Sequence, residues 1–524
     1  MARLGTGVSA TSSVKREGPR CEGGLKGVLA VVFAGMTMLV GEPAQRPNLI
    51  LILADDMGYG DIQHLNPDSR IATPNLDRLG REGMTFFDAH SPSGVCTPTR
   101  YGVVTGRYCW RSRLKRGVLG GYSEPLLDHD QITIAEMLRA AGYQTAAVGK
   151  WHLGMALPVL GENVVRKDWS GDPGIDFDGV ITDSPIHHGF GSYFGVSASL
   201  DMAPYVYVRN DRFTMKPTLN QAPVRFPHFV REGPRALDFV IDEVLDRLTR
   251  EAEHVIRVSA TKNAPFFLYL PLTGPHKPTQ PHPRFRGRTD LGEYGDFIVQ
   301  VDWTVGSILS LLDEMGIAGN TLVVFTSDNG SYMYRYDDSN QPDHVDDHGI
   351  QGYRQDRHRA NGPFRGTKAD IWDGGHHVPF LVRWPNGVSA GATCSEPICL
   401  TDLYATFADL ADTRVVRGNA EDSVSLIGML RGQRQVRGVP VIHHSSGGMF
   451  AIRDRNWKLV LGNGSGGREA PRGEPFEAPY QLFDLHSDPG ESVDVAERFP
   501  GVVESLTRKM MAIRDGRAGD EINE

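Results

Sequence analysis

Uninterrupted apolar runs that alternate with amphipathic helical patterns place the strongest constraint on the fold. Four stretches have this apolar character: residues 47–54, 265–271, 321–326 and 378–384. Such runs predict strands that are buried on both faces. Between them, residues 237–248 and 298–312 repeat apolar side chains at i, i+3, i+4 and i+7, which predicts amphipathic helices. The alternation predicts an α/β fold, in which helices flank a large, mostly parallel sheet.

The pattern changes after about residue 400, where short strand candidates follow one another directly. These candidates are residues 439–443, 450–453, 457–461 and 480–485. A helical pattern near residues 502–513 ends the series. We therefore expect two folded domains, a larger one over residues 46–400 and a smaller C-terminal α+β domain over residues 401–524. The smaller domain is predicted to hold an antiparallel sheet and a helix.

Composition narrows the functional classes. The 524 residues are 40% hydrophobic and 23% charged, which is typical of a globular chain rather than a disordered or multi-span membrane protein. The formal net charge of −9 gives no reason to expect nucleic acid as a partner.

Residues 1–45 resemble a targeting segment and are set apart from the fold. Basic residues precede an apolar run of roughly 14 residues, which suits a secretory signal peptide and is short for a membrane-spanning helix. An uncleaved N-terminal anchor is the alternative. Either way, we expect the bulk of the chain to be exported, whether periplasmic, secreted or anchored.

Five cysteines are too few and too unevenly spaced for a disulfide scaffold. Cys394 and Cys399 are close enough in sequence to pair if the chain turns between them. The sequence leaves this pairing open, because the distance between their Cα atoms decides it.

Acidic residues stand where two of the apolar runs end. Asp55 and Asp56 follow the first run, and Asp328 and Asn329 follow the run at residues 321–326. Ligands of open α/β sheets bind beyond the carboxyl ends of the strands, so both pairs should meet in one crevice. Either pair alone is typical of a turn. Together, their oxygen donors favour a hard cation such as Ca²⁺ or Mg²⁺.

Cys96, followed by Pro98 and Arg100, is a candidate nucleophile. It is either an activated thiolate beside a cation or a small buried hydrophobic residue. Glycine- or proline-bounded loops contain four further candidates: Lys150, His152, His276 and Lys368. Cations and histidines around a divalent metal suit a tetrahedral oxyanion substrate, because they neutralise its oxygens and move protons.

Residues 96–100, C-T-P-T-R, resemble the C-x-P-x-R signature of the type I sulfatases. Other segments resemble the same family in the same order: residues 53–61 (LADDMGYGD), 149–154 (GKWHLG), 187–195 (HHGFGSYFG), 326–330 (TSDNG), the stretch around Lys368, and 482–491 (LFDLHSDPGE). The resemblance covers roughly residues 47–510 and is strongest to the arylsulfatase-A-like branch. It implies an alkaline-phosphatase-like superfold and the hydrolysis of sulfate esters.

The resemblance also implies cofactors and residue roles. Cys96 would be oxidised by a formylglycine-generating or equivalent maturation enzyme, and the hydrated formylglycine would be the nucleophile. Calcium would be held by Asp55, Asp56, Asp328 and Asn329, with residue 96 completing the shell. The other roles implied are these: Arg100 and Lys150 steady residue 96, His276 and Lys368 bind sulfate and help to protonate the leaving group, His152 takes a proton from the nucleophile, and Ser199 contacts substrate.

The identity of the substrate stays open at this level. Residues 331–362 form a long polar insertion, and we expect its tyrosines, such as Tyr332, to stack on sugar faces and its arginines, such as Arg359, to bind anionic groups. A solvated loop without a ligand is nearly as well supported. The favoured substrate is a sulfated carbohydrate. The alternatives are a small aryl sulfate, a phosphate or phosphonate ester, and a non-catalytic calcium-dependent glycan-binding protein.

Overall fold

A ten-stranded mixed sheet forms the centre of the protein in this computed structural model, which describes residues 46–161, 169–225, 228–333 and 358–516. The strand order is β13-β2-β12-β11-β1-β10-β4-β5-β6-β7. Five central strands lie parallel to one another: β11 (Thr321–Ser327), β1 (Asn48–Asp55), β10 (Phe266–Pro275), β4 (Gln144–Lys150) and β5 (Ser192–Val196). Strands β1, β10 and β11 correspond to the first three apolar runs, and almost all of their residues are buried.

Antiparallel and short strands complete the sheet at both sides. The fourth apolar run forms β12 (Phe380–Arg383), which lies antiparallel to β11 and to β2 (Met84–Phe86). β13 (Ala392–Cys394) pairs with β2 at that edge, and β6 (Val208–Arg209) and β7 (Arg212–Phe213) form the other edge. The prediction of a large, mostly parallel sheet is confirmed.

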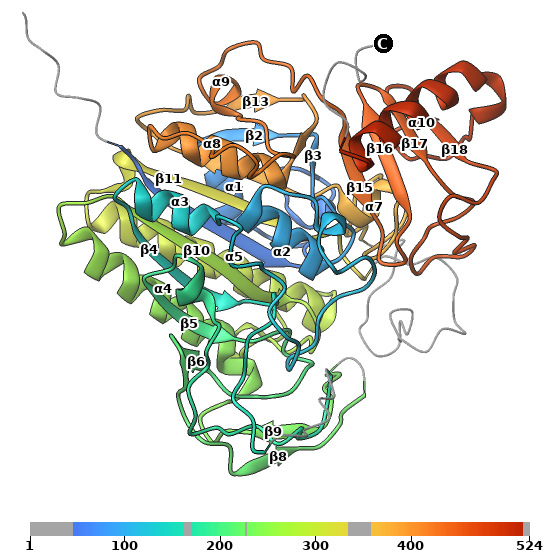
Figure 1. Cartoon of the computed structure of the whole chain (residues 1–524). Helices are drawn as coiled ribbons and strands as arrows, with labels where there is room; N and C mark the ends of the chain where they lie inside the picture. Colours follow the sequence, from blue (N-terminus) through green and yellow to red (C-terminus); the bar gives the residue numbers. More distant parts are fainter. Residues whose placement is uncertain (1–45, 162–168, 226–227, 334–357, 517–524) are drawn as a thin grey trace, which may run out of the picture. The chain divides into compact units, whose positions relative to one another are not determined.

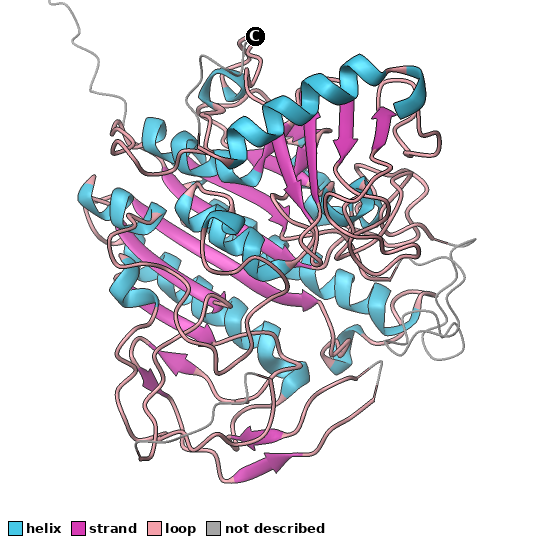
Figure 2. Ribbon diagram, turned by 45° about the vertical axis from the view of Figure 1, so that its right-hand side comes forward, coloured by secondary structure: helices cyan, strands magenta, loops and turns pink. Residues whose placement is uncertain are grey.

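Helices cover both faces of this sheet (Figures 1 and 2). The longest ones pack beside β10 and against each other: α4 (Val244–Ala260) and α5 (Gly292–Glu314), with α1 (Pro74–Arg81) alongside α5. The second group consists of α2 (Cys96–Thr105), α3 (Ile134–Ala140) and α8 (Leu403–Leu410), which contact one another. The short helix α9 (Ile427–Leu430) contacts α8, and the short helix α7 (Asp373–His376) precedes β12.

The predicted helix at residues 237–248 is wrong at its start. Leu237 is 63% exposed, and the α-helix begins only at Val244, after the short 3₁₀ turn Ile241–Glu243. Loop residues happened to continue the apolar spacing, and solvent rather than the core surrounds Leu237. The predicted helix at 298–312 lies inside α5, whose apolar side chains are buried.

A four-stranded antiparallel sheet follows, as the sequence predicts. Its order is β15 (Val441–His444), β16 (Phe450–Asp454), β17 (Trp457–Val460) and β18 (Gln481–Asp484). Helix α10 (Pro500–Arg514) packs on β16 and β17 (Figure 1). Residues Gln45–Glu524 form one compact unit, and the division at residue 400 stays a prediction. Two small two-stranded sheets pair β14 (Ile398–Cys399) with β3 (Ala89–His90), and β8 (Leu219–Gln221) with β9 (Gly233–Arg235).

Two further predictions from the sequence concern the pairing of Cys394 with Cys399 and the N-terminal targeting segment. Cys394 and Cys399 carry free thiols, so the open question of their pairing is answered against a disulfide. The predicted signal or anchor at residues 1–45 lies outside the described residues. Within the described ranges, no helix combines the length and apolar character needed to cross a membrane.

Candidate active site

The carboxyl ends of the five central parallel strands carry most of the site residues predicted from the sequence. Going across the sheet, these are Asp328 and Asn329 after β11, Asp55 and Asp56 at the end of β1, His276 after β10, Lys150 and His152 at the end of β4, and Ser199 after β5. The parallel direction of these strands brings their ends to one edge of the sheet, which explains why residues far apart in sequence meet there.

The register of the two central strands places the acidic pairs side by side. Ala54 of β1 lies opposite Ser327 of β11, and each is followed directly by an aspartate. Asp56 has φ 66°, a left-handed conformation that aspartate tolerates better than most residues. Its backbone amide donates to Asp328 Oδ1 at 3.2 Å. The strand-end pairs therefore share one buried cluster, as predicted.

Cys96 is the first residue of α2 and is only 2% exposed. Arg100 follows one turn later on the same helix face and is fully buried. Burial raises the pKa of the Cys96 thiol, against the opposing influence of Lys150 and Lys368. The raised pKa favours a neutral thiol over an activated thiolate for the unmodified side chain.

Arg100 connects two strand ends. Its Nε and one terminal nitrogen donate to Asp328 Oδ2 at 3.0 and 2.6 Å, and the other terminal nitrogen donates to the carbonyl oxygen of Lys150 at 3.0 Å. The rigid, planar guanidinium spreads its donors over three nitrogens, so one side chain reaches both acceptors in a fixed geometry. Burial opposes ionisation of Asp328, but Arg100, Lys150 and Lys368 together outweigh it and lower the pKa of this carboxyl group.

Two lysines form buried ion pairs with the other two carboxylates. Lys150 Nζ donates to both oxygens of Asp55 at 3.0 and 2.8 Å. Lys368 Nζ donates to both oxygens of Asp56 at 2.6 and 2.8 Å. Burial alone would lower the pKa of Lys368, but the Asp56 carboxylate raises it. Each of the three carboxylates thus has a buried cationic partner, and a terminal nitrogen of Arg100 also lies 3.6 Å from Asp55 Oδ1.

The cluster also offers donors that suit a hard cation. Asn329 Nδ2 donates to Asp56 Oδ1 at 2.7 Å, whereas the buried Asn329 Oδ1 has no hydrogen-bond partner. Burial raises the pKa of Asp55 to about 7, because its charge is poorly solvated there. A further cation would satisfy the free amide oxygen and stabilise the buried charge. The four predicted ligands therefore fit a calcium-type ion, whose ligands are carboxylate and amide oxygens.

The two histidines are buried, and burial lowers both pKa values well below the usual range. His152 has φ 57°, and its Nε2 lies 2.8 Å from the carbonyl oxygen of Leu119, which can only accept. Nδ1 of His152 has no partner and therefore carries the lone pair. His276 Nδ1 contacts the carbonyl oxygen of Lys277 at 2.5 Å, which leaves its Nε2 free, 3.6 Å from Asp56 Oδ2.

Ser199 is buried, and its hydroxyl has no partner. Two residues near His276, Asp201 and Lys277, were not predicted from the sequence. Asp201 forms an ion pair with Arg231, and its Oδ1 is 4.0 Å from His276 Nδ1. Burial lowers the pKa of Lys277 to about 8. In the sequence, the position of Lys277 directly after His276 is the only sign of a role in the site.

The hypothesis for Tyr332 is wrong. This ring is 2% exposed and its hydroxyl lies 2.5 Å from Thr279 Oγ1, so it packs inside the protein and cannot stack on a sugar. Arg359 is exposed. Residues 334–357, which make up most of the predicted insertion, lie outside the described residues.

Comparison with known proteins agrees with this geometry. A family model described as "Sulfatase" matches residues 47–413. The chain is 30% identical to the N-acetylgalactosamine-6-O-sulfatase of Bacteroides thetaiotaomicron, covering 90% of this chain and 94% of that protein. It is 31% identical to the steryl-sulfatase of Mus musculus, covering 90% and 83%.

A solved structure resembles the whole described fold. It comes from work on the metabolism of multiple glycosaminoglycans by Bacteroides thetaiotaomicron, with a TM-score of 0.76 and 29% identity. The match covers 90% of this chain and 100% of that one. The site geometry, the family model and these relatives lead to one conclusion: the chain is a sulfuric ester hydrolase and belongs to the type I sulfatase family.

Proposed function

We propose that this sulfatase removes sulfate from a carbohydrate, with residue 96 as formylglycine and a bound Ca²⁺ ion. The observation that carries the proposal is the buried cluster at the strand ends. There, three carboxylates are paired with buried cations, and the amide oxygen of Asn329 is left without a partner.

The calcium ion and the formylglycine would each supply a separate part of the chemistry. Asp55, Asp56, Asp328 and Asn329 are proposed to hold the metal, which would supply positive charge where a sulfate ester gains negative charge during cleavage. Formylglycine at residue 96 would supply the nucleophilic hydroxyl, since the unmodified thiol is neutral. A maturation enzyme that oxidises Cys96 is therefore a required partner.

Arg100 and Lys150 orient this centre. Arg100 fixes Asp328 by two hydrogen bonds and the end of β4 by a third, so the acidic group keeps one orientation. Lys150 does the same for Asp55. Preorganised charge of this kind costs no rearrangement when the reaction occurs.

His152 is proposed to accept a proton at Nδ1. Its Nε2–H is engaged by the carbonyl oxygen of Leu119, which fixes the tautomer and leaves Nδ1 as the only basic atom. Lys150 and Arg100 further lower its pKa, so the ring is neutral and ready to take the proton.

His276 and Lys368 are proposed to bind the sulfate oxygens and to protonate the leaving oxygen. Lys368 is cationic and points its ammonium group at the acidic cluster. His276 exposes Nε2 to the same cluster, and a bound sulfate would raise the proton affinity of this nitrogen through its negative charge. Ser199, with its free hydroxyl, is proposed as a further contact to substrate.

The carbohydrate assignment has its own support. The Bacteroides relative is named for a sulfated amino sugar, and the match covers 94% of it. Beside the cluster, Asp201, Arg231 and Lys277 provide buried or half-buried polar groups that suit hydroxyls and anions. The similar identity to a steryl-sulfatase makes aryl or steroid sulfates the alternative. We also propose that the enzyme is exported.

A substrate panel tests the proposal. Purified enzyme is assayed on N-acetylgalactosamine 6-sulfate, sulfated glycosaminoglycan oligosaccharides, a steroid sulfate, nitrophenyl sulfate and nitrophenyl phosphate. Peptide mass spectrometry of the segment with Cys96 reports the modification. We expect a kcat/KM highest on a sulfated sugar and a formylglycine mass at residue 96. A preference for the steroid sulfate would refute the carbohydrate assignment, and a preference for nitrophenyl phosphate would refute the reaction itself.

A further inference from the structure

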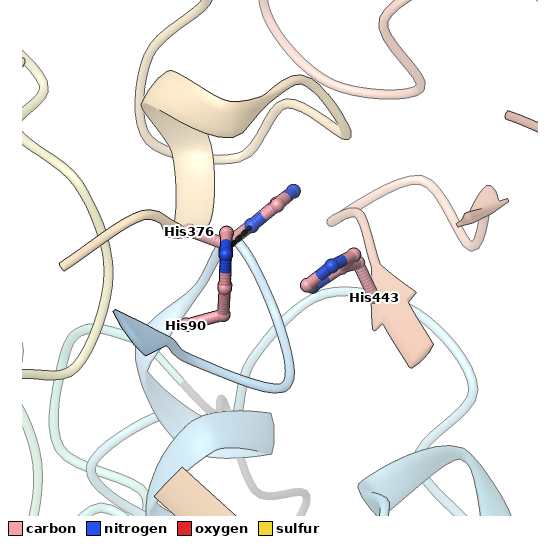
Figure 3. A group of neighbouring side chains, drawn as sticks. All are labelled: His90, His376 and His443. Carbon is pink, nitrogen blue, oxygen red and sulfur yellow. Dashed lines mark hydrogen bonds between the residues drawn. The ribbon is translucent and has the colours of Figure 1, made fainter. Parts of the chain in front are cut away.

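Three buried histidines gather outside the active site, where the four-stranded sheet meets the segments that follow β2 and precede β12. His90 ends β3, His376 ends α7 and His443 lies on β15 (Figure 3). One ring nitrogen of each lies within 4.8 Å of those of the other two. The proposed mechanism uses none of these residues.

The hydrogen-bond partners of two rings define where their lone pairs lie. His90 Nε2 is 2.6 Å from the carboxylate of Asp88, and His376 Nε2 is 3.0 Å from the carbonyl oxygen of Ile371. Both partners accept hydrogen bonds, and in the tautomer that donates to them the proton sits on Nε2 and the lone pair on Nδ1. The two Nδ1 atoms face each other at 3.1 Å. This distance suits a hydrogen bond when one ring carries its proton on Nδ1, and two ligands of one metal ion when both rings carry it on Nε2.

The separation of the Nδ1 atoms agrees with two ligands of one metal ion. Tetrahedral zinc with Zn–N bonds of about 2.0–2.1 Å places two ligand nitrogens about 3.3 Å apart. Histidine ligands of metals almost always donate their second N–H to a carboxylate or a backbone carbonyl. Asp88 and Ile371 supply these two kinds of partner.

His443 provides the third ligand. Both of its ring nitrogens are buried and have no hydrogen-bond partner, which is costly for a polar ring unless something binds it. The ring stacks on that of His376 at a centroid distance of 3.7 Å. One of its nitrogens lies within 4.8 Å of a ring nitrogen of both His90 and His376.

The charges around the cluster tolerate a cation. Arg453 contacts His90 Nε2 but donates to both oxygens of Asp88. Lys458 contacts His376 Nε2 but pairs with Asp373 at 2.6 Å and Glu491 at 2.7 Å. Both cations therefore lie on the Nε2 side of the rings, away from the facing Nδ1 atoms, and three carboxylates surround them.

We propose that His90, His376 and His443 bind one Zn²⁺ ion, which stabilises the segments around the catalytic residues. Three imidazoles suit zinc rather than calcium, which takes oxygen ligands. The same segments bond the loop before Cys96: Ser91 N donates to His376 O at 2.8 Å, and Gly94 N donates to His444 O at 3.0 Å. Ala369 N, next to Lys368, in turn donates to Gly94 O at 2.7 Å. The role of the metal is therefore structural.

The test measures zinc on the full-length enzyme with Ca²⁺ saturating, so that the active site does not take up the probe. After chelation and dialysis against Zn²⁺ with Ca²⁺, elemental analysis should give one zinc per chain. X-ray absorption at the zinc edge should show a nitrogen shell with imidazole scattering, and Zn²⁺ should raise the thermal unfolding midpoint.

Two phenylalanine variants separate a metal site from simple packing. His443→Phe keeps an aromatic ring for the stack with His376 but removes both nitrogens, and we expect zinc binding to weaken at least about 100-fold. His444→Phe, at the next buried position of β15, should bind zinc as the wild type does. If the cluster is only packing, His443→Phe will be at least as stable as wild type, because unpartnered nitrogens are removed.

The proposal is overturned by wild-type enzyme without stoichiometric zinc, by an oxygen-dominated shell, or by equal zinc binding in His443→Phe. The absorption spectrum of the wild type decides the question even if a variant does not fold. None of these results depends on sulfatase turnover, so this inference and the proposed function fail separately.

Discussion

Arg100→Met should make the stability of the protein depend more strongly on calcium. The guanidinium makes two hydrogen bonds to Asp328 and one to the carbonyl oxygen of Lys150, and it is fully buried. Removing one partner of a buried ion pair costs about 3–5 kcal/mol, because the other charge stays buried alone. The three carboxylates of the cluster would then face only two cations.

This loss translates into a measurable shift in the unfolding midpoint. Residues Gln45–Glu524 form the folded unit, and an unfolding entropy of about 2.1 cal/mol/K per residue gives about 1 kcal/mol/K for it. We therefore expect calcium-free Arg100→Met to melt about 3–5 °C below calcium-free wild type. Saturating Ca²⁺ should recover most of the difference, since the ion neutralises Asp328. Differential scanning calorimetry at one scan rate measures both effects.

Arg437→Met is the matched control. Arg437 is buried and donates to both oxygens of Asp402 at 2.9 and 3.0 Å, and neither residue is proposed to bind a metal. The control should lose similar stability, with no recovery in Ca²⁺ beyond that of wild type. The reasoning is refuted if Ca²⁺ rescues both variants equally, or if Arg100→Met is as stable as wild type in chelator.

Three further outcomes follow from the site. Cys96→Ala should keep the wild-type melting midpoint within about 1 °C, since the change is small, yet lose all sulfatase turnover; any residual turnover above background contradicts residue 96 as the nucleophile. The pKa of Lys277 near 8 makes it cationic below that pH and neutral above it, so KM for an anionic substrate should rise as pH increases through about 8. Lys277→Arg should remove this rise, and Lys277→Met should raise KM at least about tenfold already at pH 7; a wild-type KM that is flat to pH 9 would exclude contact with substrate. Tyr332→Phe removes a buried bond to Thr279 and should lower stability by about 1 kcal/mol while kcat/KM for short sugars stays unchanged.

Local sequence patterns determined the central strands and the positions of the strand-end residues. The strands β1, β10 and β11 are buried on both faces, so their residues are almost all apolar and are easily recognised in the sequence. Parallel strands also bring their carboxyl ends together wherever the chain goes between them. Those two facts suffice to predict that Asp55 and Asp328 meet.

Periodicity was less reliable at the margins of the fold. Leu237 continued the spacing of a helix but lies in solvent, because spacing says nothing about what packs against a residue. Tyr332 was expected at a sugar surface, yet a hydroxyl partner and surrounding rings bury it. Such outcomes depend on neighbours that are distant in sequence.

Tertiary structure alone decided the pairing of charges and the histidine cluster. Arg100, Lys150 and Lys368 could be predicted as site residues from the sequence. The carboxylate that each of them binds depends on distances across three strands. His90 lies 286 residues before His376, and His376 lies 67 residues before His443, so no spacing rule connects them. Their meeting follows from the packing of β15 beside β3 and α7, which only the folded chain establishes.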